Sequence, residues 1–209
     1  MTDVPSTPAD RQEHWDDRYT TIGEAAVSWH EPEPTMSLEV LDAAGVTPDA
    51  SVIDVGGGAS RLVDALVARG FGDVTVLDVS AAALDEARRR VGEATPVTWL
   101  HQDLLHWVPE RTWTVWHDRA VFHFLTEPTD REAYRQLLRR AVAPGGVVVV
   151  ATFAQDGPEW CSGLPVRRYA ATELARELGA DLEVLASGST VHRTPAGGVQ
   201  PFTWVALRR

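Results

Sequence analysis

Two acidic residues and three consecutive glycines are the residues of this chain whose types and spacing most suggest chemistry. The apolar stretch 52–55 contains Asp54 and runs directly into the glycines at 56–58. A second apolar stretch ends at Asp78, about 20 residues after the glycines. Glycines at the first turn of a βαβ unit let the backbone approach a ligand closely, and an acid at this distance is typical of a group that holds ribose hydroxyls. The pattern predicts a nucleoside site.

The glycine spacing also excludes two common nucleotide sites. A dinucleotide fingerprint needs glycine or alanine three residues after Gly58, and that position is Arg61. A Walker A loop needs a lysine, and the chain contains none. The carboxylate of Asp54 beside the turn would repel a phosphate and attract an ammonium or sulfonium ion. These residues favour a nucleoside ligand without a pyrophosphate, and S-adenosylmethionine carries both cations.

Length, charge and cysteine content limit the class of protein. A chain of 209 residues suits one α/β domain with a substantial core. The net charge of −11 opposes nonspecific attraction to nucleic acid or to an anionic membrane, so we expect neither as a partner. The single cysteine excludes an internal disulfide, and the first residues lack the features of a signal peptide, which predicts a cytoplasmic protein.

The N-terminal part of the chain is predicted to cover the main domain. Residues 1–7 are expected to be disordered, and residues 8–45 to form two helices and a lid. The first helix covers residues 8–19, with Thr7 as its N-cap and a proline at its first position. A proline-rich loop leads from it to the second helix at residues 37–44.

Apolar runs alternate with helical patterns over residues 46–209. The predicted strands cover residues 51–55, 74–78, 97–101, 113–117, 146–153, 182–186 and 201–207. The predicted helices cover residues 61–69, 81–91, 129–142 and 172–178, the third opened by a capping box of Thr129 and Glu132. Alternation of this kind predicts a parallel sheet with helices on both faces, and the proline and glycines at 194–198 make the last two strands an antiparallel hairpin. The expected fold is a single-domain, Rossmann-like, doubly wound α/β sheet of seven strands, mostly parallel with an antiparallel last strand.

With this pattern the chain resembles the class I S-adenosylmethionine-dependent methyltransferases, from about Trp15 onward. The resemblance implies that residues 1–209 are one methyltransferase domain and that the cofactor is S-adenosylmethionine. Within that class, Trp15-Asp16-x-x-Tyr19 followed by Ser28-Trp29-His30 is similar to the branch that contains the citrate synthase and elongation factor lysine methyltransferases.

The resemblance assigns roles to the residues of the glycine turn. Gly56 and Gly58 would line the methionine portion of the cofactor, and Asp54 would hold the turn or meet the ammonium group through water. Asp78, next to Val79, would accept hydrogen bonds from the two ribose hydroxyls. An alternative reading of the glycines is an ordinary tight turn, but acids at successive strand ends favour a ligand.

The resemblance also places residues around the adenine and the methyl group. Asp103 would accept a hydrogen bond from the adenine amino group, and the backbone N–H of Leu104 would donate to the ring. Trp15, Tyr19 and Trp29 would close over the methionine end, where aromatic faces suit a sulfonium ion. Pinning the N-terminal helix onto the domain is an equally good role for Trp15 and Trp29.

The end of the fourth predicted strand is where this class of enzyme meets its methyl acceptor. Asp118 is the leading candidate to orient or deprotonate the acceptor, and His123 is the second. Asp118 has alternative roles, as a partner of Arg119 or another arginine, or as a helix cap. His117 is expected to point into the core or to bond to the backbone. The segment 153–168 and the hairpin with His192 and Gln200 are expected to complete the acceptor pocket.

Three functions remain open at this point. The chain is a methyltransferase for a small molecule at nitrogen, oxygen or sulfur, a protein lysine methyltransferase, or a coenzyme-binding module without turnover. An enclosed aromatic pocket would suit a small acceptor, and an acidic rim would suit a lysine. No metal is expected, because His101, Asp103 and His106 match no known closed site. The oligomeric state cannot be read from the sequence.

Overall fold

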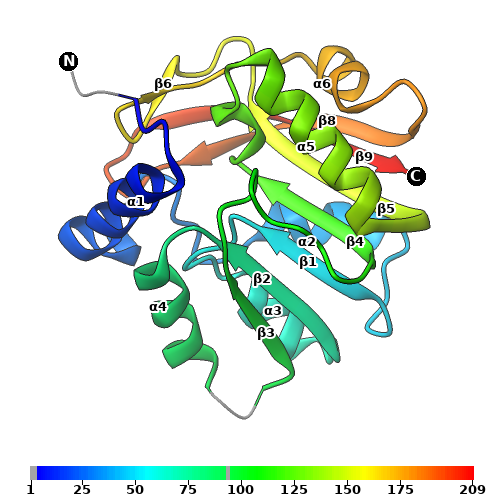
Figure 1. The fold of residues 1–209 in the computed structure, drawn as a ribbon, viewed down its shortest axis with the longest axis horizontal. Coiled ribbons are helices and arrows are strands. Elements are labelled where there is room, and N and C mark those ends of the chain that lie inside the picture. Colours follow the sequence, from blue (N-terminus) through cyan, green and yellow to red (C-terminus); the bar gives the residue numbers. More distant parts are fainter. Residues whose placement is uncertain (1–3, 93–94) are drawn as a thin grey trace.

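The computed structural model describes residues 4–92 and 95–209, which form a central seven-stranded sheet covered by helices on both faces (Figure 1). The strands of this sheet are β1 (Ser51–Val55), β2 (Asp73–Asp78), β3 (Val97–His101), β4 (Trp113–Arg119), β5 (Val142–Phe153), β8 (Glu183–Arg193) and β9 (Val199–Arg208). Two short strands, β6 (Trp160–Cys161) and β7 (Leu164–Pro165), pair with each other and were not predicted. The helices are α1 (Pro8–Ile22), α2 (Thr35–Ala43), α3 (Leu62–Ala68), α4 (Ala81–Val91), α5 (Pro128–Ala141) and α6 (Ala171–Leu178), with 3₁₀ turns η1 (Glu24–Ala26) and η2 (Phe122–Phe124).

The order of the strands confirms the predicted fold class. The order is β3-β2-β1-β4-β5-β9-β8, in which β1 to β5 run parallel and β9 runs antiparallel to both of its neighbours. β8 is much longer than its predicted segment, because its pairing with β9 continues to Arg193 and Val199. Since β1 and β4 are neighbours at the centre, the strand order reverses between them, which is where ligands bind in open α/β sheets.

The start of α1 follows its prediction. Thr7 is the N-cap and accepts a hydrogen bond from the backbone N–H of Asp10, while the Asp10 side chain accepts from the N–H of Thr7. Pro8 occupies the first helical position. Residues 1–3 of the segment predicted to be disordered lie outside the described residues. None of the helices of the described chain is long and apolar enough to span a membrane.

The predicted start of α5 is wrong by one residue. Glu127 is the N-cap, without a side-chain capping bond, and Pro128 begins the helix. Thr129 therefore lies within the first turn, and Glu132 accepts hydrogen bonds from the side chains of Arg135 and Gln136 instead of closing a capping box. Proline is well suited to the first helical position because its missing N–H has no partner there, which explains the shift.

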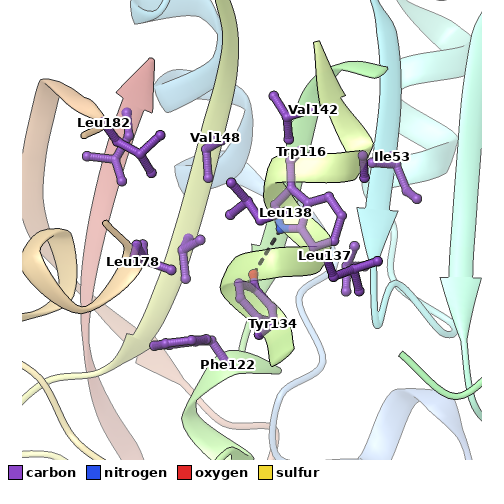
Figure 2. Packing of buried hydrophobic residues seen from close by; sticks show 14 of the residues in the cluster. Ile53, Trp116, Phe122, Tyr134, Leu137, Leu138, Val142, Val148, Leu178 and Leu182 are labelled. Carbon is purple, nitrogen blue, oxygen red and sulfur yellow. Dashed lines mark hydrogen bonds between the residues drawn. The ribbon is translucent and has the colours of Figure 1, made fainter. Parts of the chain in front are cut away.

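The core beneath α5 fixes the loop that follows β4. Trp116 of β4 donates a hydrogen bond from Nε1 to the hydroxyl of Tyr134 on α5 at 2.9 Å (Figure 2). Phe122 packs against Tyr134 with 4.7 Å between the ring centroids, and all three side chains are fully buried. Aromatic pairs of this kind contribute about 0.5–1.5 kcal/mol beyond the area they bury. The turn after β4 is therefore attached to the core.

Candidate active site

A cavity of about 630 Å³ lies at the carboxyl ends of the parallel strands. This volume is within the range of roughly 300–1,000 Å³ that is typical of small-molecule sites. Its walls come from residues 4–6, α1, the loop that contains Trp29, the turns after β1 to β4, and the β6–β7 segment. The predicted cofactor residues that line it are Trp15, Tyr19, Trp29, Gly56, Asp78, Val79, Asp103 and Leu104.

The turn after β1 can be made only by glycine at two positions. Gly56 and Gly58 have φ angles of 64° and 46°. A Cβ atom on Gly56 would clash with the side chain of Val121, and one on Gly58 would lie 2.7 Å from the Tyr19 hydroxyl and 3.0 Å from Asp78 Oδ2. The turn therefore lies close to the side chains of Val121, Tyr19 and Asp78, and the absence of Cβ atoms on the two glycines permits this approach.

Asp78 ends β2 at the wall of the cavity. Its Oδ1 accepts the backbone N–H of Ser80 at 2.8 Å. Burial raises the pKa of Asp78 to about 7, and the neighbouring charge of Asp54 adds to the shift, while the backbone N–H groups of the adjacent turns oppose it. Asp78 is thus an acid that changes charge near neutral pH inside the cavity.

Asp103 is already engaged by a side chain that the sequence did not point to. Arg11 of α1 donates from Nε to Asp103 Oδ2 at 2.6 Å, and His106 Nδ1 donates to Oδ1 at 2.8 Å. Burial raises the pKa of Asp103, but the hydrogen bonds from Arg11 and His106 outweigh it and the net shift is downward. The adenine contact proposed for Asp103 stays a prediction, and a carboxylate with further lone pairs can still accept it.

α1 is held across the cavity by Asp16, the second residue of the N-terminal motif. Its Oδ1 accepts from the Ser80 hydroxyl at 2.7 Å and from the backbone N–H of Ala82 at 3.1 Å. These groups belong to the start of α4, where a carboxylate is favourable because the first N–H groups of a helix have no partner within it. With Asp16 attached there, Trp15 and Tyr19, one helical turn apart, both line the cavity.

Four rings form an aromatic cluster over this site: Trp15, Tyr19, Trp29 and Phe124. Trp15 meets Trp29 and Phe124 edge to face, with centroid distances of 5.6 and 5.2 Å. Trp29 donates from Nε1 to the Tyr19 hydroxyl at 3.2 Å. The cluster fits both roles considered for these residues, since its members pack on one another and also face the cavity.

Asp118 does not line the cavity. The side chain is fully buried. It accepts hydrogen bonds from the Tyr134 hydroxyl at 2.7 Å and from the backbone N–H groups of Val121 and Phe122 at 2.9 and 3.2 Å. These bonds hold a turn in which Ala120 has the uncommon φ of 70°. This geometry is close to the alternative role of a helix cap, because the bonded N–H groups lie at the start of the 3₁₀ turn η2.

His123 does not line the cavity either, although its ring packs 4.4 Å from the ring of Phe124, which does. Its ring is fully buried and packs 4.8 Å from the ring of Phe153, whose backbone N–H points toward Nδ1 at 3.5 Å. Burial lowers the pKa of His123 to about 3, and the charge of Arg119 adds to this shift. The imidazole is therefore neutral at physiological pH, and the catalytic role predicted for it has no contact to support it.

Arg119 and His192 hold the loop that carries Trp29. Arg119 donates from Nη2 to Glu31 Oε1 at 2.8 Å, and its guanidinium lies 4.7 Å from the ring centre of Phe202. His192 of the hairpin contacts the carbonyl oxygen of Ser28 at 2.8 Å through Nε2. Burial raises the pKa of Glu31, but the hydrogen bond from His192 and the charge of Arg119 bring the net shift below the usual value.

Part of the segment 153–168 reaches the cavity as predicted. Cys161, Leu164 and Pro165 line the cavity, whereas Trp160 is 60% exposed and does not line it. Burial raises the pKa of Cys161 to about 11, so the thiol stays protonated and is a poor nucleophile. Across residues 4–92 and 95–209, no three His, Cys, Asp or Glu side chains are grouped so that they could hold a metal ion.

Comparison with known proteins agrees with this architecture. The family model described as a methyltransferase domain matches residues 52–146. A comparison with curated proteins found no match to the sequence. The S-adenosylmethionine-dependent methyltransferase from Anabaena variabilis is similar in structure, with a TM-score of 0.74, 17% identity and coverage of 99% of this chain and 97% of that one.

Two further similar structures contain ligands. The N-methyltransferase NodS from Bradyrhizobium japonicum, in complex with S-adenosylhomocysteine, has a TM-score of 0.69 and 16% identity, and the alignment covers 93% of this chain and 99% of NodS. The 1,6-didemethyltoxoflavin-N1-methyltransferase from Burkholderia thailandensis has a TM-score of 0.64 and 19% identity, with coverage of 100% and 93%. At these identities the likeness concerns the fold.

Residues 52–146 match a methyltransferase domain, and the chain has the fold of the class I S-adenosylmethionine-dependent methyltransferases, a class whose cofactor is S-adenosylmethionine. The residues of the cavity fit this cofactor. The glycine turn leaves room where a Cβ atom would obstruct it, and the buried carboxylates of Asp54 and Asp78 lie beside that turn.

Proposed function

We propose that the protein transfers the methyl group of S-adenosylmethionine to a small molecule held in the same cavity. The observation that carries this proposal is the continuous space of about 630 Å³ between Asp78 on one wall and Phe124, Cys161 and Leu164 on the other. The first wall has the groups expected for a nucleoside, and the second is largely apolar. A cofactor on the first wall would leave an apolar compartment for a small acceptor.

In this proposal the cofactor follows the carboxyl edge of the sheet. Gly56 and Gly58 lie along its methionine portion, Asp78 and Val79 at the ribose, and Asp103 and Leu104 at the adenine. All of these residues except Gly58 line the cavity, and they follow the ends of β1, β2 and β3, which supports the assignment. The aromatic cluster would cover the sulfonium group and exclude water from it.

The charges around the cavity favour a neutral or positively charged acceptor. Its two cations are neutralised, since Arg11 is paired with Asp103 and Arg119 with Glu31. Among the described residues, the lining acids Glu127 and Asp130 have no ion-pair partner. A carboxylate or phosphate would meet this excess of negative charge, so we propose an amine or an uncharged heteroatom as the nucleophile.

Positioning would supply most of the catalysis. Methyl transfer is an in-line displacement, and a base is needed only when the acceptor arrives protonated. Asp118 and His123 do not reach the cavity, and the Cys161 thiol is protonated at neutral pH. The proposed role of the chain is therefore to align an acceptor that carries an available lone pair and to exclude water.

A protein lysine methyltransferase is the second candidate. The unpaired acids at the cavity would suit a lysine, as would the N-terminal motif shared with that branch. The apolar wall and the cover formed by α1 and the Trp29 loop favour the small acceptor. A module without turnover is disfavoured, because Trp29 lines the acceptor space without filling it.

Transfer of a labelled methyl group tests the proposal. The protein is incubated with methyl-labelled S-adenosylmethionine and a fractionated cell extract, and the label is located by mass. We expect label in a metabolite of the low-molecular-mass fraction, with none when the Asp78→Ala variant is used as the control. Label confined to a protein band would support the second candidate, and no transfer to either fraction would contradict both.

A further inference from the structure

A buried chain of three polar side chains lies beneath the glycine turn. Asp54 Oδ1 accepts from His117 Nδ1 at 2.7 Å, and His117 Nε2 lies 2.8 Å from the hydroxyl of Ser37. The three residues come from β1, β4 and α2, and each is exposed by 2% or less. His117 was expected to point into the core or bond to the backbone, and it binds two side chains instead. The neighbouring register of the two strands, which pairs Asp54 with His117, makes this contact possible.

A serine, a histidine and an aspartate are linked here in the same order as in the catalytic triad of a serine hydrolase. The space around them does not suit that chemistry. The cavity beside Ser37 has a volume of about 50 Å³. It can hold one or two groups of the size of a water molecule, which occupies about 30 Å³ in the liquid, and it cannot hold an acyl substrate. The chain of hydrogen bonds must therefore act on Asp54.

The series of hydrogen bonds from Ser37 through His117 ends at Asp54, whose second carboxylate oxygen is free of it. Oδ2 is buried and has no hydrogen-bond partner among the described residues. It lies against the glycine turn, since a Cβ on Gly57 would be 2.5 Å from it. The small cavity that Asp54 lines shares Tyr19, Trp29 and Gly56 with the large one. A buried carboxylate oxygen without a donor is costly, so this position calls for a cationic donor from a ligand.

We propose that His117 and Ser37 are positioning residues, which hold Asp54 so that Oδ2 accepts the α-ammonium group of the cofactor. This inference depends on the cofactor site described under the proposed function. His117 fixes the carboxylate through Oδ1, and Ser37 fixes the ring of His117 from α2. Neither residue contacts the cofactor itself. Their effect on binding is specific to the amino-acid end, because the ribose and adenine have other partners.

Two ligands separate this role from a general loss of structure. S-adenosylhomocysteine carries the α-ammonium group, and 5′-deoxy-5′-methylthioadenosine has the same adenosine and thioether without the amino acid. We expect His117→Phe to weaken S-adenosylhomocysteine about tenfold or more in calorimetric titration, and methylthioadenosine by about twofold at most. The matched control is His117→Asn, whose amide can donate from the position of Nδ1. It should keep the affinity for S-adenosylhomocysteine within about threefold of the wild type.

The Ser37→Ala variant provides an independent measurement if His117→Phe does not fold. We expect it to weaken S-adenosylhomocysteine about threefold, without affecting methylthioadenosine. Equal weakening of both ligands, or unchanged affinity for S-adenosylhomocysteine in His117→Phe or in Ser37→Ala, would overturn the proposal. If the wild-type protein bound neither ligand, the cofactor site itself would be wrong. Binding without methyl transfer would contradict only the proposed function.

Discussion

Asp78 and Asp118 occupy equivalent places at the ends of two parallel strands and yet serve different purposes. Both are buried, and burial raises the pKa of Asp78 to about 7 and that of Asp118 to about 6. Asp78 lines the large cavity, whereas Asp118 lines neither cavity. The comparison shows that an acid at a strand end is available to a ligand only when the protein leaves part of its hydrogen-bonding capacity unused.

The segments that follow the two strands cause this difference. After β2 the chain enters α4, whose first turn is capped by the Ser80 hydroxyl and by Asp16 of α1. Asp78 is therefore not needed as the side-chain cap of that helix. After β4 the chain makes the tight turn η2 beneath α5, and two backbone N–H groups and the Tyr134 hydroxyl are directed at Asp118. Asp118 serves as the cap there.

The largest expected effect is the loss of stability on removing Asp118. Asp118→Ala leaves buried donors without acceptors, and we expect the free energy of unfolding to fall by about 3 kcal/mol. Chemical denaturation measures the change. The exposed Asp85→Asn serves as the control and should shift the free energy by no more than about 0.5 kcal/mol. A stable Asp118→Ala variant that binds cofactor normally but does not turn over would restore the catalytic role and remove the contrast with Asp78.

Asp78→Asn should show the opposite pattern. Loss of charge-assisted hydrogen bonds to ribose is expected to weaken S-adenosylhomocysteine about 100-fold, equivalent to about 2.7 kcal/mol. The stability of the unliganded protein should fall by less than about 1 kcal/mol or rise, since a buried carboxylate is removed. Calorimetric titration and denaturation of the same sample measure both quantities. Wild-type affinity in this variant would remove Asp78 from the ribose site.

The pH dependence separates the two acids further. Because burial raises both pKa values above the unfolded value of 3.8, the folded state favours the protonated forms. This contribution to stability is complete below pH 3.8 and is lost as the pH rises through about 6 for Asp118 and about 7 for Asp78. We therefore expect the unliganded protein to lose stability between about pH 4 and pH 7, and the part of the loss between about pH 6 and pH 7 to be absent in Asp78→Asn.

Cofactor affinity should change with pH in the opposite direction. A positively charged ligand favours the ionised form of Asp78, so its affinity is expected to rise as the pH rises through about 7. Calorimetry in two buffers of different ionisation enthalpy would detect the proton released on binding. An affinity that is flat between pH 6 and 8 would show that Asp78 does not titrate on binding.

The smallest expected effect concerns Cys161, which shares the cavity with Asp78 but carries no charge. Because burial keeps its thiol protonated, Cys161→Ser should change kcat/KM for the acceptor by about threefold at most. Methyl transfer to the identified acceptor measures this effect. A decrease of about 100-fold in kcat/KM would show that the Cys161 thiol takes part in the reaction as well as shaping the cavity.

Much of the fold could be predicted because its signals are local. The bounds of β1, β3 and α4 match their predictions, since apolar periodicity and flanking turn residues lie within each segment. The length of β8 could not be predicted in this way, because residues 187–190 are small and mostly polar, and the strand continues through them by pairing with β9. The link between Arg11 and Asp103 joins residues 92 positions apart and leaves no local pattern.

The amino-acid sequence alone determined the glycine turn after β1 and the acid that ends β2. Those features depend on the φ angles that glycine can adopt and on the two-residue period of side chains along a β-strand, which are properties of short segments. Only the tertiary structure decided which acids stay open to a ligand. Strand register brings the His117 donor to Asp54, and helix packing brings the Tyr134 donor to Asp118. These hydrogen bonds depend on distance in space rather than on distance along the chain.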